Sequence, residues 1–282
     1  MISEEQKNKI KEELNKKKTN KKYKNYILKY IELNNEIFPF LDINEITDRI
    51  LNNFNKVSIN LTSFIYNDYG QYNPTTGKIL LSPKLFFGKN KKYKESVFLH
   101  ELDHCACTPI EVRQKYNEYK NKINKKYKII PDFILSEIFF KIYYEGPISG
   151  IANLERKKGY TIQKITYGTN IQNYLNEGIT YFKQKIYSEK LNIKFHKNKD
   201  YLYGARRAAE CIGEVIGVEY MIYNHFYNNF DNIENAFFER TNIKIEELIL
   251  KCINYDKRNS KKKLKQLNDF IQEISIKNSK KS

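Results

Sequence analysis

The segment 95–109 reads ESVFLHELDHCACTP and contains the pattern H-E-x-x-H. On a helix, His100 and His104 project from one face because they lie one turn apart, and Glu101 stands beside them. Two imidazoles on adjacent turns can bind one Zn²⁺, and a neighbouring carboxylate can take a proton from a water molecule that the metal activates. The segment therefore predicts a helix that binds a metal ion.

The apolar residues of the same segment also have helical spacing. Phe98, Leu102 and Cys105 follow one another at i, i+4 and i+7 and form an apolar stripe, with the histidines on the other side of the helix. Pro109 predicts the end of the helix. Cys105 and Cys107 could bind a soft metal as a C-x-C pair, but the place of Cys105 on the stripe favours packing in the core.

The remaining chain is expected to be mostly helical, with a small sheet before the metal helix. β-branched and aromatic residues predict strands at 57–66 and 78–82, on either side of the turn sequence NPTTG. The segment 77–83 is the candidate edge strand for an extended substrate, with an ordinary hairpin as the alternative. Apolar periodicity predicts helices at 3–36, 43–54, 111–128, 133–144, 171–191, 203–225, 232–239 and 245–255.

A catalytic zinc site needs a third protein ligand besides the two histidines. Glu177 is a candidate because it lies on the expected helix 171–191, next to Gly178, which permits close approach of another backbone. Arg206, Glu210 and Glu214 are spaced as an internal row of ion pairs, and Glu214 becomes the rival ligand if this row faces the metal.

The sequence HELDH at 100–104, followed by LNEGIT at 175–180, resembles the gluzincins. In that family of zinc metallopeptidases, a Glu on a later helix completes the zinc site. The resemblance implies that His100, His104 and Glu177 bind one Zn²⁺ per chain and that Glu101 is the general base. It also implies an α+β, predominantly helical, zincin-like fold, in which a small sheet precedes the H-E-x-x-H helix and the C-terminal half is helical.

The chain departs from the gluzincin pattern after the ligand Glu. Many relatives carry an acidic residue there, whereas this chain has Thr180 and Tyr181. The partner that orients a ligand histidine is therefore unassigned. Asp103 is one candidate, although an exposed Asp103 is the favoured interpretation. The candidates for stabilising the oxyanion are Tyr174, Tyr181, Tyr203, Tyr220, His196 and His225.

Composition limits the class of protein. The chain has 282 residues, four cysteines, no signal-peptide pattern and no apolar run long enough to span a membrane, so we expect a cytoplasmic protein. Its net charge of +17 is attributed mainly to solvated helix faces and tails, which does not favour a nucleic-acid partner. We expect one compact body, with a helical layer at 1–55, a metallopeptidase domain at 56–255 and a basic tail at 256–282.

These observations predict a zinc-dependent metallopeptidase that hydrolyses a peptide or protein substrate by metal-activated water. One alternative is a zincin-like regulatory or mobile-element protein that acts by binding a protein or nucleic acid. A third is nucleic-acid binding through the basic faces, whose affinity would fall steeply with salt.

Overall fold

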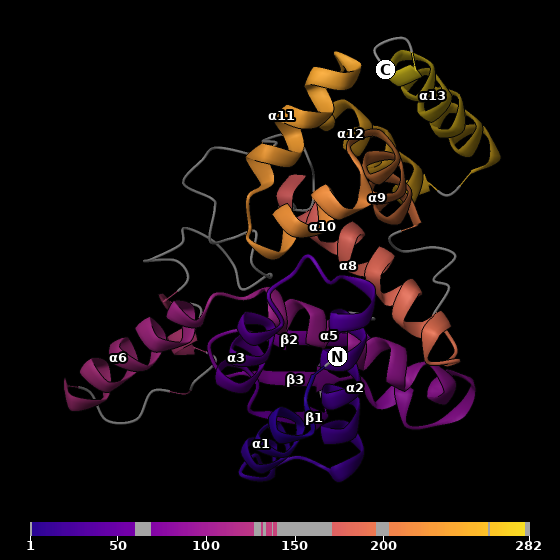
Figure 1. Cartoon of the computed structure of the whole chain (residues 1–282). Helices are drawn as coiled ribbons and strands as arrows, with labels where there is room; N and C mark the ends of the chain where they lie inside the picture. The colour runs from indigo at the N-terminus through magenta and orange to yellow at the C-terminus, as the bar shows by residue number, and fades with distance from the viewer. Residues whose placement is uncertain are drawn as a thin grey trace. The chain divides into compact units, whose positions relative to one another are not determined.

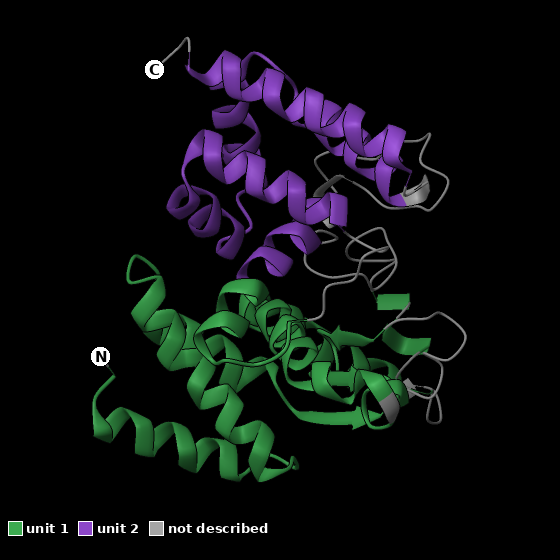
Figure 2. Ribbon diagram, turned by 90° about the vertical axis from the view of Figure 1, so that its right-hand side faces the viewer, with its two compact units in different colours: residues 1–157, 184–196 green, residues 158–183, 197–282 purple. Residues whose placement is uncertain are grey.

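The computed structural model describes residues 2–59, 69–126, 131, 134–136, 138–139, 171–195, 203–258 and 260–279. The chain divides into two compact units, coloured green and purple in Figure 2. Unit 1 comprises residues 1–157 and 184–196, and unit 2 comprises residues 158–183 and 197–282. The N-terminal helices share unit 1 with the sheet and with the helix that carries H-E-x-x-H.

Unit 1 begins with α1 (Glu4–Asn15), α2 (Lys21–Ile37) and α3 (Ile43–Asn53). The single helix predicted at 3–36 is thus two helices. The break has a local cause, because the side chain of Asn20 accepts a hydrogen bond from the backbone N–H of Lys22 and caps a new helix.

The sheet consists of β1 (Lys56–Ile59), β2 (Gly70–Asn73) and β3 (Lys78–Leu81) in the order β1-β3-β2. β3 pairs in parallel with β1 and antiparallel with β2, so the prediction of an edge strand at 77–83 is wrong. Gly77 closes the β2–β3 turn with a φ of 65°. The C-terminal part of the strand predicted at 57–66 lies outside the described residues.

The helix that carries H-E-x-x-H, α5 (Lys94–Cys107), follows two short 3₁₀ helices, Pro83–Leu85 and Gly88–Tyr93. It packs against α2, α3, β2 and β3 (Figure 1). All its residues from 96 to 107 are buried. The helix therefore contacts the protein on all sides and not only through the predicted stripe. It ends before Pro109, as predicted, and α6 (Ile110–Lys126) follows.

The apolar side of α6 packs against the described residues after Pro131. Val112 and Tyr116 of α6 form a buried cluster with Leu135 and Phe139. Residues 134–136 and 138–139 are helical, in agreement with the helix predicted at 133–144, and the remainder of that prediction lies outside the described residues.

Helix α8 (Ile171–Lys190) runs through the division between the units, which falls between Lys183 and Gln184. Unit 2 continues with α9 (Tyr203–Ile216), α10 (Val218–Phe226), α11 (Phe230–Thr241), α12 (Ile245–Arg258) and α13 (Lys261–Ser279). The described chain is thus α+β and predominantly helical, as predicted. None of its helices is long and apolar enough to cross a membrane.

Two features of unit 2 differ from the sequence-based expectations. The single helix predicted at 203–225 is interrupted at Gly217, whose φ of 93° ends α9 and starts α10. The expected basic tail instead contains α13, which packs against α11 and α12. Leu267, Ile271 and Ile274, spaced one helical turn apart, are its buried residues.

Candidate metal centre

The two histidines of α5 point at one another inside unit 1. The Nε2 atoms of His100 and His104 lie 3.2 Å apart, and both side chains are buried. Two nitrogens that bind one tetrahedral Zn²⁺ at about 2.0–2.1 Å would lie about 3.3 Å apart. The pair therefore has the spacing of two ligands of one ion, without a change of backbone or rotamer.

The carboxylate of Glu101 lies against strand β2. A Cβ atom built on Gly70 would come within 2.7 Å of Oε1 of Glu101 and 2.7 Å of Cγ1 of Val97. Only a residue without a side chain fits between the strand and the helix at this position. The backbone of the antiparallel strand β2 thus adjoins Glu101.

The C-terminal half of α8 is anchored in unit 1. Nε2 of Gln184 donates a hydrogen bond of 2.7 Å to the backbone oxygen of Ser96, and the hydroxyl of Tyr187 donates one of 2.9 Å to Oδ1 of Asn34. Ser96 lies on α5 and Asn34 on α2. This part of α8 therefore docks against the metal helix near its N-terminal end.

The same helix carries Glu177 two turns before Gln184, a distance of about 10 Å along the axis. The possible ligand atoms of His100, His104 and Glu177 all lie within 4.8 Å of one another. These residues form a group that could hold a metal ion.

Glycine at position 178 has the role suggested by the sequence. A Cβ atom on Gly178 would lie 2.3 Å from the backbone oxygen of Ala205, so α8 and α9 are in close backbone contact there. Within the same unit, Nε2 of His225 lies 2.8 Å from Oδ1 of Asn176, the residue before Glu177. Both flanks of Glu177 are therefore held by other helices of unit 2.

Asp103 is buried, so the prediction of an exposed carboxylate is wrong. Its Oδ1 accepts a hydrogen bond of 2.5 Å from the hydroxyl of Tyr30 on α2. The sequence offered no direct signal for this pair, because the two residues are 73 positions apart. The burial of α5 on all sides accounts for it, since a carboxylate inside the helix packing needs a donor.

The rival candidates fit a metal site less well. Glu214 is exposed on α9, and Glu210 forms the ion pair predicted with Arg206, at 3.8 Å, and a further one with Arg207, at 2.7 Å. Cys105 is fully buried, as the packing interpretation predicts, and burial raises the pKa of its thiol to about 12. A neutral thiol buried in the core behaves as a small apolar side chain, in agreement with the packing interpretation.

The residues considered for stabilising the oxyanion differ in their surroundings. Tyr181 is half-buried on α8, one turn after Glu177 and on the same face, whereas Tyr174 donates its hydroxyl to Asp256 of α12. Tyr220 is exposed, and Tyr203 stacks on Tyr255. His196 lies outside the described residues. Tyr181 is thus the tyrosine best placed along α8 for a role beside Glu177.

The donor set suits Zn²⁺. Two neutral imidazoles and one carboxylate are a common ligand set of catalytic zinc sites, and they leave a fourth position for water or substrate. The two imidazoles are buried and already directed toward a common point, and a carboxylate is available from α8. The residues present therefore fit the metal that the sequence pattern implies.

Comparisons of the chain with family models, with curated proteins and with solved structures find no match.

Proposed function

We propose that this chain is a zinc-dependent metallopeptidase with a gluzincin-like ligand set and a zincin-like arrangement of sheet and metal helix. The single observation that carries the proposal is the 3.2 Å separation of the His100 and His104 Nε2 atoms, on the buried helix that also presents Glu101. In this proposal His100, His104 and Glu177 hold the metal, and Glu101 is not a ligand.

Zinc, when bound, supplies a Lewis acid that polarises the scissile carbonyl and lowers the pKa of water. The chain's own groups provide the remaining chemistry. The carboxylate of Glu101 accepts a proton from the attacking water and later donates it to the leaving amine. Gly70 leaves room for this carboxylate beside β2. A substrate held extended along β2 would therefore pass directly over Glu101.

The proposal is tested by replacing Glu101 with Gln, which keeps the size of the side chain and removes the base. A cleavable substrate is first sought with a mixed peptide library and wild-type protein. For Glu101→Gln we expect zinc content and melting temperature close to wild type and peptide turnover reduced by about 10²–10⁴-fold.

The matched control is Glu95→Gln, which makes the same change on the same helix. Glu95 lies in the first turn of α5 and forms an ion pair of 2.6 Å with Lys22. Its replacement should not affect turnover. Equal turnover in Glu101→Gln and wild type would remove Glu101 as the base. Zinc binding without cleavage of any peptide by the wild type would favour a zincin-like protein that acts by binding a partner.

A further inference from the structure

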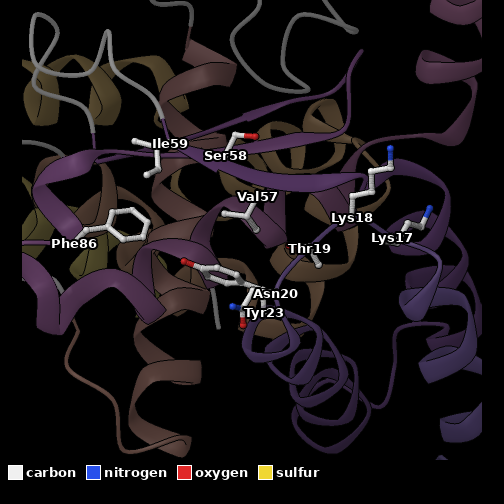
Figure 3. A pocket seen from close by; sticks show the side chains of 9 residues that line it. All are labelled: Lys17, Lys18, Thr19, Asn20, Tyr23, Val57, Ser58, Ile59 and Phe86. Carbon is white, nitrogen blue, oxygen red and sulfur yellow. The ribbon is translucent and has the colours of Figure 1, made fainter.

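A groove of about 540 Å³ opens beside β1, on the edge of the sheet opposite β2 (Figure 3). One side of the groove is strand β1, and the other is the connection between α1 and α2 together with the first turn of α2. All its lining residues belong to unit 1. None of them lies on β2, the strand that carries the close contact to Glu101.

The groove presents the edge of β1 and not one of its faces. Val57, Ser58 and Ile59 are consecutive, and all three line it, although alternate side chains of a strand point to opposite faces. Among the described residues β1 pairs only with β3. Alternate N–H and C=O groups of a strand at the edge of a sheet point away from its single partner and are available to a further strand.

The wall opposite the strand is basic, and the floor is partly apolar. Lys17 and Lys18 line this wall, and none of the described lining residues is acidic. Nζ of Lys17 is held by a hydrogen bond of 2.8 Å to the backbone oxygen of Leu51, whereas Lys18 is exposed. Tyr23 and Phe86, whose rings Figure 3 shows, are half-buried.

One more feature points to an apolar contact at the end of the strand. Ile59 is 53% exposed, although it occupies a strand position next to the rings. A strand edge whose backbone groups have no second strand partner among the described residues, with an exposed aliphatic residue and two cations beside it, matches an extended segment with alternating apolar and acidic side chains. The four residues of β1 would pair with a segment of about 13 Å.

We propose that this groove binds an extended, acidic peptide segment of a protein partner, which adds a strand to the free edge of β1. The backbone of the segment pairs with β1, its acidic side chains face Lys17 and Lys18, and its apolar side chains cover Ile59, Tyr23 and Phe86. This site goes beyond the proposed peptidase activity and does not depend on the metal centre.

The test measures binding of a fluorescein-labelled hexapeptide of alternating Glu and Val by fluorescence polarisation. The full chain is used with Glu101→Gln, so that the probe is not hydrolysed. Lys18→Glu reverses a charge on the groove wall and should weaken binding roughly three- to tenfold. Lys11→Glu makes the same change at an exposed position of α1 that does not line the groove, and it should change affinity by less than about twofold.

Three further probes separate the possible ligands. A hexapeptide of alternating Lys and Val should not bind, because its charge matches that of the wall. A Glu-Val hexapeptide methylated at every backbone nitrogen keeps the charges but cannot pair with a strand, and it should bind at least about tenfold more weakly. A thymidine hexanucleotide should not displace the Glu-Val peptide.

The proposal is overturned if the Glu-Val peptide does not bind, or if Lys18→Glu and Lys11→Glu weaken its binding equally, since the net charge of +17 would then account for the attraction. Unchanged affinity of the methylated peptide would exclude strand addition. Displacement of the peptide by the hexanucleotide, with a loss of hexanucleotide binding in Lys18→Glu, would assign the groove to nucleic acid.

Discussion

At the scale of single residues, the candidate site depends on positions where the size of the side chain is restricted by its neighbours. Gly70 is one of them, because its missing side chain leaves the space that the carboxylate of Glu101 and the methyl group of Val97 occupy. A sequence cannot indicate this role for a glycine, since the close approach exists only after β2 has paired with β3 and packed on α5.

We predict that Gly70→Ala separates catalysis from folding. The added methyl group must displace Glu101 or push β2 away from α5, and a base displaced by about 1 Å can lower turnover by about 10²-fold. Zinc content should stay near wild type, because the atoms nearest to the added methyl group belong to Glu101 and Val97 and not to the histidines. Gln71→Ala, at the exposed neighbouring position of β2, should leave turnover unchanged. Equal turnover in wild type and Gly70→Ala would contradict the placement of the base against β2.

Two buried tyrosines allow a second test at the same scale. The hydroxyl of Tyr30 donates to the carboxyl group of Asp103, and that of Tyr187 donates to the neutral amide of Asn34. Hydrogen bonds to charged groups contribute about 1.5–3 kcal/mol and neutral ones about 0.5–1.5 kcal/mol. Tyr30→Phe should therefore lower the free energy of unfolding more than Tyr187→Phe. Denaturant titration of the two variants measures the difference, and the reverse order would show that Asp103 does not depend on Tyr30.

At the scale of helices and strands, the polar contact that joins three helices of unit 2 makes stability depend on pH. Asp256 of α12 accepts hydrogen bonds from the hydroxyl of Tyr174 on α8 and from the backbone N–H of Gly204 on α9. Burial of Asp256 nevertheless raises the pKa of its carboxyl group above the usual 3.8. The folded chain therefore binds this proton more tightly than the unfolded chain does.

The sign of the resulting pH dependence follows from proton linkage. Where the folded state binds more protons, stability falls as the pH rises, so Asp256 should contribute less stability as the pH rises from about 3.8 through its raised pKa in the folded state. The unfolding free energy of wild type minus that of Asp256→Asn should decrease over that range and then stay constant. This comparison cancels the other titrating groups. A difference that grows with pH would mean that the two hydrogen bonds outweigh burial.

The sequence predicted local elements better than it predicted their partners. The metal helix, the Gly77 turn and the helix that carries Glu177 follow from spacing and turn chemistry within a few residues. The central position of β3 was missed because strand order depends on pairing between distant segments. The break at Gly217 and the packing of α13 were missed because single glycines occur inside helices and Lys-rich helices resemble tails.

At the scale of the whole molecule, both histidines are buried within unit 1. Sequence motifs could locate the candidate ligands on two helices but could not show the burial that surrounds the histidines. A metal ion held by His100 and His104 on α5 and by Glu177 on α8 would bind the folded chain only, because the unfolded chain does not bring these side chains together.

The last prediction uses that linkage. A ligand present at 100 times its dissociation constant stabilises the folded state by about 2.7 kcal/mol. For a chain of this size, each kcal/mol shifts the melting temperature by about 2–4 °C, so removal of zinc by a chelator should lower it by about 5–10 °C, and added zinc should restore it. Elemental analysis should find about one zinc per chain.

His104→Ala and Glu177→Ala should lose most of the zinc and the response to the chelator. Glu189→Ala, an exposed position on the same helix as Glu177, should keep both, as should Glu214→Ala at the rival position on α9. If Glu214→Ala loses zinc while Glu177→Ala retains it, the third ligand is reassigned. If wild-type protein takes up no zinc and its melting temperature does not respond to either treatment, the metal centre itself is refuted.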